Sequence, residues 1–303
     1  MRIIKSEEIS HRQLIGLTSL RADEFMAILS EFDKLWLQYY SYYDLKGNKR
    51  SLPKHSEHSD ISLKGSHDKL LFILIYLQQN PTQAYHGLMF SMSQGKVSQW
   101  LKLLLPLLEK SLHRLGMLPQ RRADQLYLSL KALAEYFILL DGTERVIPRS
   151  VDYERQRFYY SGKKGEHTVK NNLIINKEKK VLFLSATVEG SMHDKALADE
   201  MELLFPPEGV LMQDLGFLGF SPDKVKVVMP EKKPKNQELS SEDKAFNQLV
   251  SSMRVTVEHA IGAIKRLRIV QEKIRLRIEN IHDRVMLIAC GLHNLRIEYR
   301  NLS

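Results

Sequence analysis

Cysteine is almost absent from this chain of 303 residues, and the one present, Cys290, ends the apolar stretch that begins at Val285. A single cysteine cannot build a disulfide framework, and it supplies too few thiolates for a cysteine-based zinc site. The sequence therefore predicts that Cys290 is a buried core residue of a protein in a reducing compartment.

Long hydrophobic runs are also lacking. No segment approaches the roughly 18 consecutive apolar residues that a membrane helix needs. The first residues, Met1 to Glu8, contain no apolar core of the kind that a secretory signal has. We expect a soluble intracellular protein, located in the cytoplasm with the nucleoid.

Acidic residues are outnumbered, with 36 Asp and Glu against 45 Lys and Arg, which gives a formal net charge of +9. Basic side chains that neutralise phosphates release counterions, so this balance favours a polyanionic partner. Nucleic acid is the leading class of partner, an anionic membrane surface is the weaker one, and we expect no membrane association. The hydrophobic content of 43% over this length is enough for a catalytic domain with smaller appendages.

The N-terminal part of the chain has helical periodicity. Residues 22–36 place Phe25, Ile28 and Phe32 on one face, which predicts an amphipathic helix that needs a partner. Three more helices are predicted further on, at residues 66–77, 82–90 and 93–105.

The last two of these helices are short segments joined by a tight turn, as in a helix-turn-helix. The final helix carries three polar side chains near its start, Gln94, Lys96 and Gln99. In a helix-turn-helix these positions face the major groove, so we interpret them as candidate DNA-binding residues. The alternative is a plain three-helix bundle that binds no DNA.

Strand-like runs replace the helices from about residue 136. Three strands are followed by a helix, two further strands and a long helical pattern, at residues 136–141, 167–176, 180–188, after Ser191, 209–214, 224–229 and 241–270. This order is that of a ribonuclease-H-like fold, in which the first strand and the strand after the helix lie side by side. The predicted fold class is α/β, with a ribonuclease-H-like mixed-sheet catalytic domain preceded by an all-α helix-turn-helix region.

Three acidic residues occupy prominent places in this pattern. Asp141 and Asp214 each close a predicted strand, and Glu258 lies within the last helix. Carboxylates are the hard oxygen ligands that Mg²⁺ and Mn²⁺ prefer. Two such ions about 3.5–4 Å apart can stabilise both the attacking and the leaving oxygen of a phosphoryl transfer. The sequence therefore predicts a metal-dependent enzyme acting on a phosphodiester.

Five motifs occur in sequence across this region: Leu140-Asp-Gly-Thr-Glu144, Tyr160-Ser-Gly-Lys-Lys-Gly-Glu-His-Thr-Val-Lys170, Gly190-Ser-Met-His-Asp194, Gln213-Asp-Leu-Gly-Phe217 and Arg254-Val-Thr-Val-Glu-His-Ala-Ile-Gly-Ala-Ile-Lys265. Together and in this order they resemble the DDE transposases of bacterial insertion sequences, in the insertion-sequence-five group related to Harbinger transposases.

The resemblance implies that Asp141, Asp214 and Glu258 bind two Mg²⁺ (or Mn²⁺) ions and catalyse DNA transposition. Water would cut the transposon end, and the freed 3′-hydroxyl would attack target DNA. The implied partners are double-stranded DNA, both transposon terminal repeats and target DNA, and further copies of the chain in a homodimer or higher oligomer.

Asp194 has two interpretations. The spacing Ser191-x-x-Asp194 before a helical pattern predicts a capping box, which is a structural role. The resemblance implies instead a further metal ligand, or the second main ligand in place of Asp214. Both remain open from the sequence.

Basic residues around the carboxylates are candidate DNA-backbone contacts. Lys163, Lys164 and His167 belong to a basic segment that also includes Arg145 and Lys170. Arg254 and Lys265 lie four residues before and seven residues after Glu258, on nearly the same helix face. The alternative is a solvated stripe with an Arg254–Glu258 pair.

These patterns divide the chain into an N-terminal helical segment and linker at 1–60, a helix-turn-helix-like region at 61–135, and a ribonuclease-H-like DDE endonuclease domain at 136–303. Two rivals to the transposase remain. One is a domesticated nuclease of the same fold without strand transfer. The other is a DNA-binding regulator whose carboxylates are relics.

Overall fold

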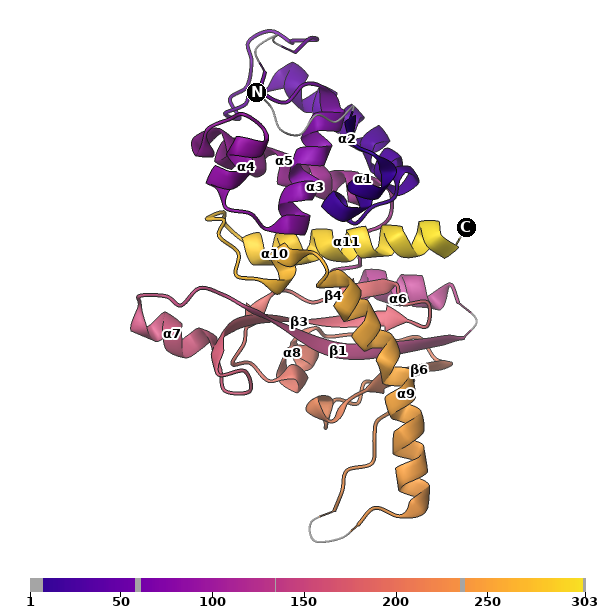
Figure 1. Cartoon of the computed structure of the whole chain (residues 1–303). Coiled ribbons are helices and arrows are strands. Elements are labelled where there is room, and N and C mark those ends of the chain that lie inside the picture. The colour runs from indigo at the N-terminus through magenta and orange to yellow at the C-terminus, as the bar shows by residue number, and fades with distance from the viewer. Residues whose placement is uncertain (1–7, 58–60, 134, 235–237, 302–303) are drawn as a thin grey trace. The chain divides into compact units, whose positions relative to one another are not determined.

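The computed structural model describes residues 8–57, 61–133, 135–234 and 238–301, which fall into two compact units (Figure 1). The helical unit comprises residues 1–118 and 265–303, and the sheet unit comprises residues 119–264. This division differs from the expected one, because residues 119–135 join the sheet unit and residues 265–303 join the helical unit. The predicted linker residues 58–60 lie outside the described ranges.

The helices of the helical unit are α1 (His11–Thr18), α2 (Ala22–Tyr42), α3 (Gly65–Gln79), α4 (Gln83–Met89), α5 (Gln94–Arg114), α10 (Arg268–Gln271) and α11 (Ile281–Asn301). Helix α3 is the central one, since every residue from Asp68 to Leu77 is buried and α1, α2, α5 and α10 all contact it. A helix that is buried on all sides needs other elements packed around it.

The C-terminal helix α11 belongs with the first helices because of its apolar stripe. Its buried residues Ile281, Val285, Ile288 and Leu292 recur every three or four positions, and the helix contacts α2 and α5. Cys290 is buried in α11, as expected. The apolar face explains why this segment packs with the first helices in the helical unit.

Helices α4 and α5 form the predicted helix-turn-helix. The Thr82 and Ser93 hydroxyls accept hydrogen bonds from the first-turn N–H groups of Tyr85 and Lys96, which caps both helices. The turn is tight: a Cβ added at Gly87 would lie 2.4 Å from the Met92 carbonyl oxygen. Only glycine permits this approach of the two backbone segments.

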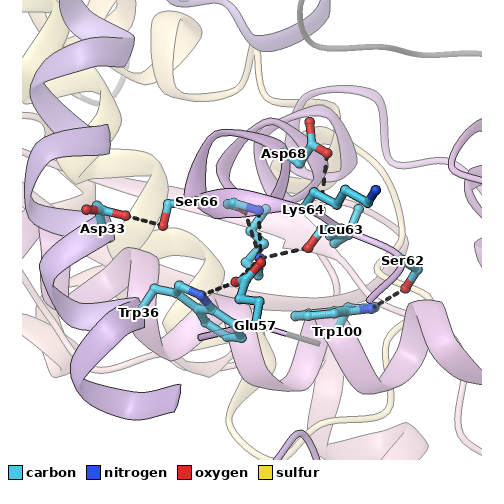
Figure 2. A network of polar contacts seen from close by, with 11 residues as sticks. Asp33, Trp36, Glu57, Ser62, Leu63, Lys64, Ser66, Asp68 and Trp100 are labelled. Carbon is cyan, nitrogen blue, oxygen red and sulfur yellow. Dashed lines mark hydrogen bonds and ion pairs between the residues drawn. The ribbon is translucent and has the colours of Figure 1, made fainter. Parts of the chain in front are cut away.

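A buried lysine ties the segment before α3 to two helices. The Lys69 ammonium, which is fully buried, donates to Glu57 Oε1 at 2.6 Å and to the carbonyl oxygens of Leu63 and Gly65. Trp36 Nε1 donates to the same Glu57 oxygen at 2.6 Å (Figure 2). The ammonium also lies 4.5 Å from the Trp36 ring and 5.7 Å from the Trp100 ring. Burial of this charge is tolerated because it is paired.

We predict that Glu57→Ala lowers the free energy of unfolding of the helical unit by about 3 kcal/mol, because it leaves a buried ammonium without its counter-ion. Urea titration followed by tryptophan fluorescence measures this, since both tryptophans flank Lys69. The matched control is Lys34→Met, which breaks an exposed ion pair with Glu31 and should cost less than about 1 kcal/mol. Equal effects of the two substitutions would contradict the prediction.

The sheet unit is built on a mixed sheet. Its main strands are β1 (Tyr136–Val146), β3 (Glu166–Asn176), β4 (Val181–Leu184), β6 (Gly209–Gln213) and β7 (Val225–Val228), with short strands β2 (Tyr160–Ser161) and β5 (Val188–Glu189). Strand β1 pairs antiparallel with β3 and parallel with β6, and β6 pairs parallel with β7. Strand β3 pairs antiparallel with β2, β4 and β5. The expected neighbours, the first strand and the strand after the helix, are therefore side by side.

Three predicted boundaries were wrong. Strand β1 continues past Asp141 to Val146, because β3 pairs with it from Ile138 onward. The predicted strand 180–188 is two strands, β4 and β5, and the Ser185 side chain between them accepts from Asn172 N–H and donates to the Ala186 carbonyl. The last helix of this unit, α9, runs from Ser241 to Ile264, so it ends before residue 270.

Helices cover the two faces of the sheet differently. Helices α6 (Ala123–Lys131) and α8 (Asp194–Glu200) pack on the face that presents Tyr136, Ile138 and Leu140. Side chains of a strand alternate between faces, so Leu139 and Asp141 point to the opposite one. Helix α9 contacts β1 and crosses it in Figure 1, with its own buried residues outside the first cluster. Asp141 therefore points to the face beside α9.

Among the helices of the described ranges, none is both long and apolar enough to span a lipid bilayer.

Candidate active site

Asp141 and Asp214 are neighbours because of the parallel pairing of β1 with β6. The register pairs Leu140 with Gln213, which is the last pair, so the two aspartates follow it directly on adjacent segments. Asp214 is the N-cap residue of the 3₁₀ helix η2 (Leu215–Phe217), and its Oδ1 accepts a hydrogen bond from Gly216 N–H at 2.8 Å. Asp141 Oδ1 accepts from its neighbour Gly142 N–H, also at 2.8 Å. The sequence prediction that these two aspartates lie together is confirmed.

Asp194 approaches the same place from the α8 side of the sheet. A Cβ added at Gly142 would lie 3.1 Å from Asp194 Oδ1, and one added at Gly216 would lie 3.2 Å from Asp194 Oδ2. The carboxylate thus fills the space that these two glycines leave between β1 and η2. Since the Gly216 position also lies 2.9 Å from Asp214 Oδ1, Asp194 and Asp214 are close to each other.

The predicted capping box at Ser191 and Asp194 was wrong. The N-cap residue of α8 is His193, which makes no side-chain cap bond, and Asp194 is the first residue of the helix. Ser191 Oγ donates instead to the Phe158 carbonyl oxygen at 2.7 Å. The Asp194 side chain is therefore engaged by the sheet rather than by its own helix terminus.

Helix α9 brings a cation and a further carboxylate. Arg254 Nη2 lies 3.3 Å from Asp214 Oδ2, so Arg254 pairs with this aspartate rather than with Glu258. Glu258 follows one helical turn later, about 6 Å along the helix axis. It is exposed and has no hydrogen bond or ion pair with any residue that the structure describes.

Burial and a neighbouring charge disfavour the ionised form of Asp141. The pKa of Asp141 rises to about 6, first because of burial and next because of the Asp214 charge, while the Gly142 N–H and Arg254 oppose the rise. Asp141 Oδ2 and Asp194 Oδ2 accept no hydrogen bond from the described part of the chain. A cation bound beside Asp141 and Asp214 would relieve the repulsion between these two carboxylates.

The donor set suits a hard divalent cation, since carboxylate oxygens are what Mg²⁺ and Mn²⁺ prefer. Within the described ranges, however, no three His, Cys, Asp or Glu side chains are grouped closely enough to hold a metal ion. The structure places Asp214 beside Asp141 and near Asp194, and Glu258 lies one helical turn after Arg254 on α9. A metal site here would require the side chains to converge on the ion.

The candidate DNA-binding residues of the sheet unit differ in their exposure. Lys163 and Lys164 are exposed in the turn between β2 and β3, whereas His167 is half-buried with its ring 5.7 Å from that of Tyr160. Lys265 lies in the turn after α9, so its expected place on the helix face of Glu258 was wrong. Arg145, which belongs to the same basic segment of the sequence, is buried and donates to Asn171 Oδ1 at 2.5 Å.

In the helix-turn-helix, Gln94 and Lys96 are exposed in the first turn of α5. Gln99 is half-buried, and its Nε2 donates to the Leu45 carbonyl oxygen at 2.9 Å. Gln94 and Lys96 are thus better placed to reach a DNA groove than Gln99.

Sequence reasoning missed the side chains that hold Asp194. Lys170 Nζ lies 3.0 Å from Asp194 Oδ1 and 3.6 Å from Glu144 Oε1. The sequence analysis placed Lys170 in a basic segment around the carboxylates and gave Glu144 no role beyond its place in a motif. Their antiparallel pairing on β1 and β3 could have been found only from the strand register.

We predict that Asp141→Asn stabilises the metal-free protein at pH 7 by about 2 kcal/mol but has little effect at pH 4. The pKa of Asp141 is about 6 in the folded protein and 3.8 as the ordinary value, so the folded state binds more protons between these pH values. Its contribution to stability therefore falls as the pH rises from about 4 to about 6, and asparagine removes that loss.

The measurement is chemical unfolding in a metal chelator at both pH values. The control is Asp223→Asn, an exposed aspartate of the same unit, which should change stability by no more than about 0.5 kcal/mol. The same stabilisation by Asp141→Asn at both pH values would contradict the prediction.

Comparison with known proteins gives two family matches and one similar protein. Residues 140–294 match the family described as "DDE superfamily endonuclease", and residues 62–114 match "Helix-turn-helix of DDE superfamily endonuclease". The chain is 27% identical over 230 residues to a protein of Microchaete diplosiphon described as "Probable transposase for insertion sequence element IS702", over 76% of this chain and 80% of that protein. No solved structure matches the chain.

These matches confirm the resemblance that the five motifs carry, and they favour the helix-turn-helix over a plain bundle. The endonuclease match begins at the residue before Asp141 and extends through Asp194, Asp214 and Glu258, over more than half of the chain. The chain belongs to the DDE superfamily of endonucleases.

Proposed function

We propose that this endonuclease is a DNA transposase, which cuts DNA at the ends of a mobile element and joins the freed ends to target DNA. The observation that carries the proposal is the adjacency of Asp141 and Asp214 at the end of the β1–β6 pairing, with Asp194 beside them. Family membership and the description of the relative from Microchaete diplosiphon support it.

Divalent metal ions are general in DDE endonucleases, and the proposed ligands here are Asp141, Asp214 and Glu258, with Asp194 as a further one. Two bound Mg²⁺ or Mn²⁺ ions would stabilise the attacking and leaving oxygens at phosphorus. The chain itself supplies the hard oxygens and a buried setting for Asp141, which strengthens electrostatic interactions there. Arg254, which pairs with Asp214 in the structure, would contact a phosphate once that carboxylate binds a cation.

Cleavage and joining are the same chemical exchange at phosphorus. In cleavage, a water oxygen forms a bond to phosphorus and the 3′-oxygen of the element end leaves with a proton. In joining, that 3′-hydroxyl attacks a target phosphodiester, loses its proton, and a target oxygen leaves. Because charge develops on the same atoms in both steps, one set of carboxylates serves both.

The proposed DNA contacts divide between sequence reading and backbone binding. Gln94 and Lys96, and less directly Gln99, would read the terminal repeats in the major groove. Lys163, Lys164, His167, Arg254 and Lys265 would contact phosphates, and the net charge of +9 supports a polyanionic partner. Two element ends must be handled together, so we propose a homodimer or higher oligomer on DNA.

The decisive experiment is cleavage of DNA carrying the element's own ends, in Mg²⁺, by the wild type and by Asp141→Asn, Asp214→Asn and Glu258→Gln. We expect each variant to lose on the order of 10³-fold in the rate of 3′-hydroxyl release while still binding the DNA. Asp223→Asn is the matched control and should retain wild-type cleavage.

The outcome also separates the rival functions. Wild-type cleavage without joining to target DNA would favour a nuclease of the same fold. Wild-type binding that neither needs metal nor leads to cleavage would favour a regulator and would overturn the proposal.

We also predict that Lys96→Ala weakens DNA binding and lowers the slope of log affinity against log salt by about 1, because one phosphate or base contact is lost. Fluorescence anisotropy at several salt concentrations measures both quantities. Lys34→Ala, which alters an exposed lysine of α2 in the same unit, is the control and should leave affinity unchanged. Unchanged binding by Lys96→Ala would exclude the start of α5 as the DNA-reading element.

A further inference from the structure

Lys170 is a buried cation at the edge of the carboxylate cluster. Its side chain is only 5% exposed, and its ammonium lies 3.0 Å from Asp194 Oδ1 and 3.6 Å from Glu144 Oε1. An ammonium removed from water in this way is stable only when it is paired. Lys170 is therefore fixed between two carboxylates rather than free to contact DNA from the surface.

Glu144 anchors this lysine. The two residues are directly opposite in the antiparallel pairing of β1 and β3, so their side chains lie on the same face of the sheet. Glu144 is 9% exposed, and its second oxygen accepts from Thr168 Oγ1 at 2.9 Å. Glu144 thus belongs to the rigid sheet, and it holds Lys170 in one place.

Lys170 in turn holds one carboxylate oxygen of Asp194. Lys170 binds Oδ1, and Asn172 Nδ2 donates to the Asp194 backbone oxygen at 3.0 Å. The other carboxylate oxygen, Oδ2, faces Gly216 beside Asp214 and accepts no hydrogen bond within the described ranges. A carboxylate held by one oxygen and open at the other can act as a ligand through the open one.

We propose that the Glu144–Lys170 pair is a positioning device that presents Asp194 Oδ2 to a divalent cation beside Asp214. Lys170 is a positioning residue, because it acts through Asp194. This inference rests on the metal site of the proposed function and assigns Asp194 to that site as a ligand.

Electrostatics alone predicts the opposite effect of removing Lys170, which makes the inference testable. A lysine close to a cation site repels the cation, so its neutralisation should strengthen metal binding if Lys170 only balances charge. If Lys170 positions Asp194, its removal weakens metal binding in spite of the lost repulsion. The sign of the change distinguishes the two roles.

The experiment is titration of the full chain with Mn²⁺, with free Mn²⁺ measured by electron paramagnetic resonance. We expect Lys170→Met to weaken Mn²⁺ binding by at least about fivefold, and Lys170→Gln, which keeps a hydrogen-bond donor, to recover part of that loss. The matched control is Lys195→Met, since Lys195 adjoins Asp194 but pairs with Asp199 at the surface. Its Mn²⁺ affinity should equal that of the wild type.

A double-mutant cycle tests whether Lys170 acts through Asp194. Asp194→Asn should weaken Mn²⁺ binding by itself, and adding Lys170→Met to it should cause no further loss. Circular dichroism checks that each variant is folded. If Lys170→Met does not fold, the sign of the change in Lys170→Gln decides the question, since charge balance predicts tighter binding and positioning predicts weaker binding.

Wild-type or tighter Mn²⁺ binding by folded Lys170→Met overturns the inference, as does wild-type affinity in Asp194→Asn. Failure of the proposed function would be seen differently, as absence of Mn²⁺ binding and of metal-dependent cleavage in the wild type itself.

Discussion

The parallel pairing of β1 with β6 is the constraint on which the candidate site depends. It ends at the pair Leu140–Gln213, and the chain supplies an aspartate immediately after each of these residues. Backbone hydrogen bonds thereby hold two carboxylates side by side in spite of their repulsion. The pKa of Asp141 is raised first by burial and next by the neighbouring Asp214 charge. The apolar core on the α6 and α8 face supplies the stabilisation that keeps the strands in register.

Cations of the chain itself balance part of this charge. Arg254 pairs with Asp214 from α9, and Lys170 pairs with Asp194 from β3. The two differ in their surroundings, because Arg254 is partly exposed on a helix whereas Lys170 is buried in the sheet. A partly exposed arginine can exchange its carboxylate for a phosphate at little cost, and a buried lysine cannot. This contrast is why we assign a DNA-facing role to Arg254 and a positioning role to Lys170.

Much of the fold could be predicted from the sequence. The 3.6-residue periodicity located α2, and the helices predicted at residues 66–77, 82–90 and 93–105 correspond to α3, α4 and α5. The apolar runs before Asp141 and Asp214 located β1 and β6. Periodicity did not predict the end of a strand where pairing with another strand decides that end. Strand β1 extends five residues past Asp141 because β3 is long enough to pair with it, and local sequence does not reveal a partner's length.

By itself, the sequence determined which side chains and local structures are available. These are carboxylates that follow apolar strands, basic residues around them, and a pair of helices typical of a helix-turn-helix. These follow from side-chain chemistry and from local periods. Only the tertiary structure decided which charges meet. Lys170 was expected in a basic segment that contacts DNA, but the strand register pairs it with Glu144 beside Asp194. Ser191 was expected to cap a helix, but its hydroxyl donates to the Phe158 carbonyl oxygen. Strand register and packing bring together residues that are far apart in the chain, and a local sequence pattern does not reveal such contacts.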